Sequence, residues 1–152
     1  MPMYSSPKRQ SFPVRYVAVF LALGALSACR LEPATGPVDI DWGQERDARC
    51  NMMVDNPRFA AEVRDAGGKV WKFDDIGCAV IWMEQHGLAG ETPGIEVWVK
   101  DHETGEWLDA RRVRYVHGVK SPMRYQFGAT GKESGDGIGY GEMRRRILAL
   151  GR

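Results

Sequence analysis

The amino-acid sequence predicts an α+β domain, in which a mostly antiparallel sheet carries helices packed on it. The first observation behind this prediction is a mixture of two patterns. Some segments have apolar side chains at alternate positions, and others have them at helical spacing. The second observation is that the two clearest alternating segments are separated by a short polar turn, which favours an antiparallel hairpin over a parallel crossover.

The first elements after the polar N-terminal region are predicted in order along the chain. Residues 47–54 are short and partly apolar, so they predict a strand or an extended segment. The pair Asn56–Pro57 predicts a helix start, because Asn caps helices and Pro fits the first helical position. Apolar residues at helical spacing follow, and the glycine pair 67–68 would end this helix. Residues 70–73 then predict a strand.

The next element is a second helix. Asp74 or Asp75 is suited to cap it, an apolar helical run follows, and Gly87 ends it. The two carboxylates admit another interpretation, as a catalytic acid–base pair. Acidic residues ahead of an apolar helical run more often cap the helix and favour its positive end, so we expect capping here.

The second half of the domain begins with a hairpin. Residues 95–100 alternate as a strand, residues 101–105 are a turn, and residues 107–116 predict the partner strand. The glycine-rich segment 128–141 predicts a flexible loop, and it lacks the strand-to-helix context of a phosphate-binding loop. Residues 142–150 predict a last, basic helix.

The start of the chain has the features of a secretion signal. Basic residues precede an apolar run, residues 16–26, that is too short to span a bilayer comfortably. The following sequence, Leu26-Ser27-Ala28-Cys29, resembles a bacterial lipobox, in which the cysteine is lipidated and becomes the mature N-terminus. The alternative is an ordinary N-terminal membrane anchor with an incidental cysteine. We therefore expect a lipid anchor at Cys29 and a location in the bacterial cell envelope, facing the periplasm.

Composition divides the chain into three parts. We predict a signal peptide over residues 1–28, a lipid-anchored tether over residues 29–45 and a folded domain over residues 46–152. The tether prediction rests on a stretch rich in Pro, Gly and acidic residues without a core pattern. The formal net charge is +1, and no basic stripe stands out, so nucleic-acid binding is not expected.

A sulfur-rich stretch is the first candidate site. Cys50, Met52 and Met53 fall within four positions. Free Cys and Met are often simply buried, so a piece of apolar core is one interpretation. In an extended segment, however, Cys50 and Met52 would share a face and Met53 would point away. A thiolate and a thioether together select Cu(I), whereas zinc is disfavoured because no CxxC or His pair is present.

Two soft ligands are few, so further ligands are expected. Met123 follows a proline, which fixes the backbone there, although Met123 is equally suited to fill the core. His117 is the second candidate, since imidazole suits copper, but a lone histidine is more often structural. Cys78 lies in an apolar helical run and is predicted to be a buried structural thiol. The alternatives for Cys78 are a disulfide with Cys50 or a second metal ligand.

The order of these motifs resembles the NosL family, the lipoproteins accessory to nitrous oxide reductase. The most specific parts are Cys50-Asn51-Met52, the segment 73–77 (FDDIG), the pair Tyr115-Val116 and the segment 121–123 (SPM). Many relatives look like C-x-x-C-G-M at the site, whereas this chain has Arg49-Cys50-Asn51-Met52 without a second cysteine. The resemblance implies that residues 46–152 form a copper-binding domain.

The function implied by this resemblance is that of a Cu(I) chaperone, not an enzyme. Such a protein helps to load the copper–sulfide centre of nitrous oxide reductase during denitrification. Its expected partners are that reductase and the membrane-bound proteins that assemble its copper and sulfur. The competing hypothesis is a structural or assembly lipoprotein that binds no metal. A hydrolase or redox enzyme is disfavoured, because the sequence shows no convincing nucleophile–base pair.

Overall fold

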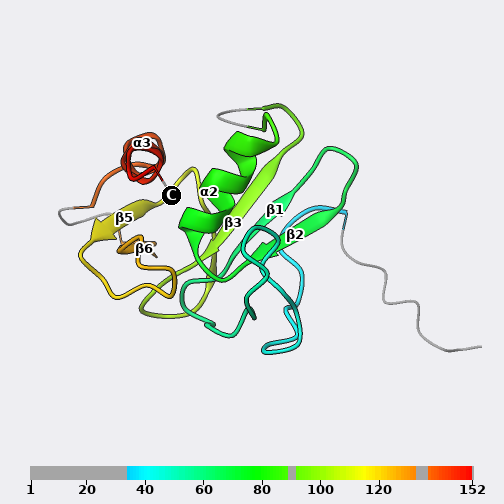
Figure 1. Ribbon diagram of the computed structural model, residues 1–152, viewed down its shortest axis with the longest axis horizontal. Helices are drawn as coiled ribbons and strands as arrows, with labels where there is room; N and C mark the ends of the chain where they lie inside the picture. The colour runs from blue at the N-terminus through cyan, green and yellow to red at the C-terminus, as the bar shows by residue number, and fades with distance from the viewer. Residues whose placement is uncertain (1–33, 89–91, 133–136, 152) are drawn as a thin grey trace, which may run out of the picture. The chain divides into compact units, whose positions relative to one another are not determined.

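The computed structural model describes residues 34–88, 92–132 and 137–151, which belong to one compact unit (Figure 1). It confirms the predicted α+β class, and within the described ranges it has two helices and six strands. In chain order the elements are β1 (Ala61–Arg64), β2 (Val70–Phe73), α2 (Ile76–Gln85), β3 (Glu96–Lys100), β4 (Trp107–Asp109), β5 (Arg114–His117), β6 (Phe127–Thr130) and α3 (Tyr140–Ala149). None of the helices described is both long and apolar enough to cross a membrane. Cys29 and the predicted signal peptide lie outside the described residues.

The strands form two antiparallel sheets. The larger sheet has the order β2-β1-β3-β4, and the smaller one pairs β5 with β6. Strand β1 is central in the larger sheet, since Ala61 is in register with Phe73 on one side and with Val99 on the other. Helix α2 packs against β1 and β2, and α3 packs against α2 and β5 (Figure 1). The main core therefore lies between the larger sheet and α2.

Helix α2 confirms the prediction for this segment. Asp75 is its N-cap and accepts a hydrogen bond from the backbone N–H of Gly77 at 2.9 Å. The helix ends at Gln85 with His86 as its C-cap, and Gly87 follows with a φ of 67°, a left-handed conformation that glycine adopts easily. Every residue from 76 to 83 is buried, which explains the continuous apolar run in the sequence. The predicted hairpin of β3 and β4 and the C-terminal helix α3 are also present.

The helix predicted after Asn56 is wrong. Strand β1 occupies this place, and Ala61 and Val63 face the main core while Glu62 is buried on the opposite face. The carboxylate of Asp65 accepts hydrogen bonds from Gly67 and Lys69, so the glycine pair makes the turn between β1 and β2. Pairing with two neighbouring strands outweighed the local helical spacing.

Two further predictions need correction. The strand predicted over residues 107–116 is divided, because the chain turns after Asp109, whose carboxylate accepts from the Arg111 backbone N–H. Residues 114–117 then form β5 in the second sheet. The glycine-rich loop prediction fails at its start, since Gly128 belongs to β6 and is in register with Val116. A Cβ atom at position 128 would lie 2.7 Å from the His102 ring, so glycine permits this close packing.

The predicted tether ends earlier than expected. Val38 and Ile40 are buried, and the backbone N–H of Val38 donates to the Glu62 carboxylate at 2.9 Å. Gly36 donates similarly to Glu96 at 2.7 Å. Because Glu62 alternates with the core-facing Ala61, this segment covers the face of the sheet opposite α2. The folded domain therefore includes residues 36–45, which the sequence assigned to the tether.

Glu62 makes folding stability depend on pH. Its side chain is 1% exposed, Oε2 accepts from Val38, and Oε1 has no hydrogen-bond partner among the described residues. Burial raises the pKa of Glu62 to about 7, although Lys72 and Arg64 oppose the shift. The folded protein thus retains this proton at pH values where the unfolded chain has lost it. Stability should fall as the pH rises from about 4.5 to about 7.

We expect Glu62→Gln, which mimics the protonated side chain, to raise the free energy of unfolding by about 2 kcal/mol at pH 8. At pH 4.5 the variant and the unmodified protein should be equally stable. Urea unfolding at several pH values measures this difference. An identical pH dependence for both proteins would contradict the assignment to Glu62.

Candidate metal centre

The sulfur-rich stretch lies at the tip of an irregular hairpin formed by residues 41–54. Gly43 donates to the Val54 carbonyl at 2.9 Å, Val54 donates to Glu45 at 3.0 Å, and Arg46 and Met53 form an isolated antiparallel bridge. The tip itself is a turn, because the backbone N–H of residue 51 bonds to the carbonyl of residue 47. Cys50 is therefore presented on a turn, between the two arms of the hairpin.

Asp47 determines the shape of this turn. Its Oδ1 atom accepts from the backbone N–H groups of Arg49 at 2.9 Å and Cys50 at 3.0 Å. Its Oδ2 atom accepts from the backbone N–H of Asp74 at 3.0 Å. The buried carboxylate thus folds the tip and ties it to the residues that precede α2.

The prediction of a strand or extended segment over residues 47–54 is wrong for this reason. Asn51 adopts a φ of 61°, so the alternation that placed Cys50 and Met52 on one face does not apply. Met52 and Met53 are both exposed, at 55% and 49% of their surface. Cys50 is half-buried and packs against the main core.

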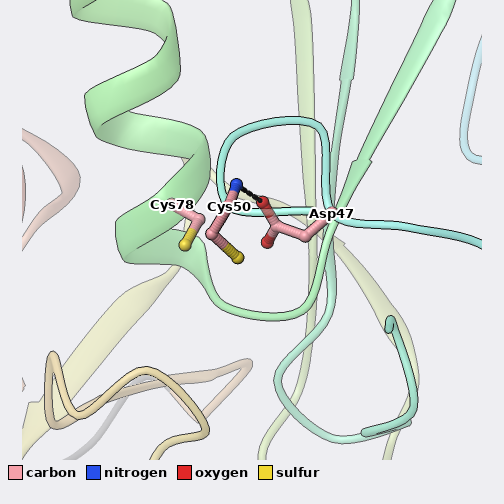
Figure 2. Close-up of side chains that lie close together, drawn as sticks. All are labelled: Asp47, Cys50 and Cys78. Carbon is pink, nitrogen blue, oxygen red and sulfur yellow. Dashed lines mark hydrogen bonds between the residues drawn. The ribbon is translucent and has the colours of Figure 1, made fainter. Parts of the chain in front are cut away.

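Cys78 approaches Cys50 from the first turn of α2. Figure 2 shows both sulfur atoms on the same side of Asp47, with Cys50 between the helix and the carboxylate. The ligand atoms of Asp47, Cys50 and Cys78 all lie within 4.8 Å of one another. Both cysteines are free thiols, Cys50 half-buried and Cys78 buried. The prediction that Cys78 is buried is confirmed. The proximity of Cys78 to Cys50 is compatible with a shared metal ion or with a disulfide.

Burial controls the protonation of the two thiols. It raises the pKa of Cys50, and the negative charge of Asp47 adds to the effect. Burial also raises the pKa of Cys78 well above its usual range, while a hydrogen bond from Arg49 lowers it in part. Both thiols therefore hold their protons near neutral pH. A metal ion bound at this group would have to displace these protons.

Arg49 completes the surroundings of the thiols. Its Nη1 atom lies 3.9 Å from Cys78 Sγ and donates to Tyr125 Oη at 3.2 Å. Tyr125 is buried over the N-terminal turn of α2, where its ring touches Gly77. Sequence reasoning missed Arg49 and Tyr125, because no local pattern indicates that residues 49, 78 and 125 meet.

The other predicted ligands are placed differently. The backbone N–H of Met123 donates to Asp75 Oδ2 at 3.0 Å, which brings this half-buried residue beside the start of α2. His117 lies at the exposed end of β5, with its ring 4.9 Å from that of Phe127. Among the His, Cys, Asp and Glu side chains described, one group is close enough to hold a metal ion, and it does not include His117.

The donor set of this group is soft. Asp47 already accepts three backbone hydrogen bonds, which leaves one of its roughly four lone-pair sites for a metal. The remaining donors are two sulfur atoms. Magnesium and calcium require several oxygen ligands, whereas thiolates favour Cu(I) or zinc. The arrangement is thus suited to a soft cation.

Comparison with known proteins assigns no family to this chain. No protein-family model matches this chain, and no curated protein matches its sequence at a significant level. The candidate centre therefore rests on the contacts of Asp47, Arg49, Cys50 and Cys78.

Proposed function

We propose that this protein is a lipid-anchored, periplasm-facing Cu(I) chaperone. The observation that carries the proposal is the pair of thiols from Cys50 and Cys78, whose sulfur atoms lie within 4.8 Å of each other. Two thiolates at this separation offer Cu(I) the ligands that it prefers. The resemblance to the NosL family supports a more specific function, delivery of copper for the copper–sulfide centre of nitrous oxide reductase.

The position of the thiols supports transfer of the ion over permanent storage. Cys50 is half-buried at a turn, so a partner can reach it, whereas Cys78 is buried behind it. The exposed Met52 and Met53 lie next in the chain and offer weak thioether donors at the surface. Copper can pass between proteins by ligand exchange when one donor atom at a time is replaced.

The nearby carboxylates support a binding protein over an enzyme. Asp74 accepts from the backbone N–H groups of Asp55 and Asn56, at 3.0 and 2.9 Å. Asp75 caps α2 and accepts from Met123. Both side chains hold backbone segments in place. The capping interpretation applies to Asp75, whereas Asp74 fixes the backbone of residues 55 and 56.

A structural lipoprotein without metal is the second candidate. It is favoured by the packing of Cys50 against the main core, which a small apolar residue would also provide. This candidate accounts for Asp47, which folds the hairpin tip, but it gives no role to two free thiols held within 4.8 Å of each other.

Anaerobic titration of the detergent-solubilised full-length protein with Cu(I), against a chromophoric Cu(I) chelator, tests the proposal. We expect each chain to bind one Cu(I) ion and to retain it in competition with the chelator. We also expect the ion to pass to copper-free nitrous oxide reductase when its maturation proteins are present. A protein that leaves all Cu(I) with the chelator would instead support the structural lipoprotein.

A further inference from the structure

We propose that Arg49 is a specificity-determining residue of this centre, whose positive charge favours a monovalent soft ion over a divalent one. The inference rests on the proposed function, since it concerns the ion that the Cys50–Cys78 pair accepts. The inference assigns a role at this centre to a residue whose own side chain does not bind the metal ion.

The geometry holds the guanidinium beside the thiols. The backbone N–H of Arg49 is fixed by Asp47, so its side chain leaves the hairpin tip next to Cys50 and reaches α2. There Nη1 contacts Cys78 Sγ at 3.9 Å and Tyr125 Oη at 3.2 Å. The Nε atom is buried and has no hydrogen-bond partner among the described residues. Arg49 as a whole is half-buried, and turning its side chain into solvent would break both contacts of Nη1.

The charges around the ion explain the expected preference. Asp47, Cys50 and Cys78 together supply three negative charges once both thiols are deprotonated, a set that would suit a divalent ion such as Zn²⁺. Arg49 cancels one of these charges. A fixed positive charge also repels a divalent ion twice as strongly as a monovalent ion at the same distance. With Arg49 in place, the centre is electrostatically closer to a bare pair of thiolates, which suits Cu(I).

Tyr125 keeps the guanidinium in this position. Its ring is 3% exposed and packed against Gly77, so its hydroxyl is a rigid acceptor for Nη1. Removing that hydroxyl should loosen the guanidinium without changing the charge of the protein. Tyr125→Phe is therefore a milder version of the loss of Arg49.

The test compares the affinities of the full-length protein for Cu(I) and for Zn²⁺, measured separately by anaerobic chelator competition. Arg49→Met should lower the ratio of Cu(I) affinity to Zn²⁺ affinity by roughly 10- to 100-fold, the effect of one unit charge a few ångströms away. Arg49→Lys, which retains the charge, should restore most of the ratio. Arg58→Met is the matched control, because it removes one positive charge from an exposed turn and should leave the ratio unchanged.

The outcomes separate this inference from the proposed function. If Arg49→Met lowers the affinities for Cu(I) and Zn²⁺ by the same factor, or changes neither affinity, Arg49 is a structural residue and the inference is wrong. If Arg49→Met does not fold, Tyr125→Phe must lower the ratio by itself, and an unchanged ratio overturns the inference. If the unmodified protein does not bind Cu(I), the proposed function fails and this inference fails with it.

Discussion

Replacing Cys50 with alanine should abolish tight Cu(I) binding, with an affinity at least roughly 1,000-fold lower, because an anionic soft ligand is removed from a centre with few donors. Cys78→Ala should cause a loss of similar order, since its sulfur lies within 4.8 Å of Cys50. Anaerobic chelator competition with the full-length proteins measures both losses. Circular dichroism and urea unfolding show whether each variant is folded.

The same experiment distinguishes two ligand sets. The sequence predicts Cys50, Met52, Met123 and, as a substitute, His117. The geometry favours Cys50 and Cys78. If the thiol pair is the centre, Met52→Leu, Met123→Leu and His117→Ala should each change the affinity by less than about tenfold, as expected for weak or absent donors.

Met83→Leu is the control for the Met-to-Leu exchange itself, because Met83 is buried in the main core and belongs to neither ligand set. Met-to-Leu exchanges nearly conserve volume and should leave the fold intact. A folded Cys50→Ala protein that retains the original affinity and stoichiometry would refute both ligand sets.

Gly77→Ala should destabilise the protein by about 3 kcal/mol or more, a large effect for one methyl group. A Cβ atom at this position would lie 2.1 Å from Tyr125 Cδ2 and 2.2 Å from Cγ. The ring cannot move aside easily, because it is buried and its hydroxyl accepts from Arg49. Urea unfolding should show a lower midpoint, and displacement of Tyr125 should also weaken the hold on Arg49.

Gly141→Ala is a closely matched control. Gly77 and Gly141 are each the second residue of a helix, α2 and α3, but a Cβ atom at position 141 would meet nothing within 4 Å. We expect that variant to be neutral or more stable by up to about 1 kcal/mol, as alanine favours helices. Equal stability of the two variants would show that the contact of Gly77 with Tyr125 is not tight in solution.

Predictions from sequence succeeded where the cause of a structure is local. The cap at Asp75, the end of α2 near Gly87 and the turn between β3 and β4 each depend on residues a few positions apart. The helix expected after Asn56 failed because β1 is paired on both sides with strands that are distant in sequence. The local spacing of apolar residues carries no information about such pairing, and the pairing outweighs a weak helical preference.

The sequence by itself determined the α+β class and the main helix with its cap, and it singled out Cys50 as a candidate ligand for a soft metal. Only the tertiary structure decided which atoms surround that thiol. Asp47 bends the tip, so Met52 turns outward, and the packing of α2 brings Cys78 to Cys50 across 28 positions of sequence. The physical reason is that side chains become neighbours through the packing of whole elements, which depends on core contacts far from the site.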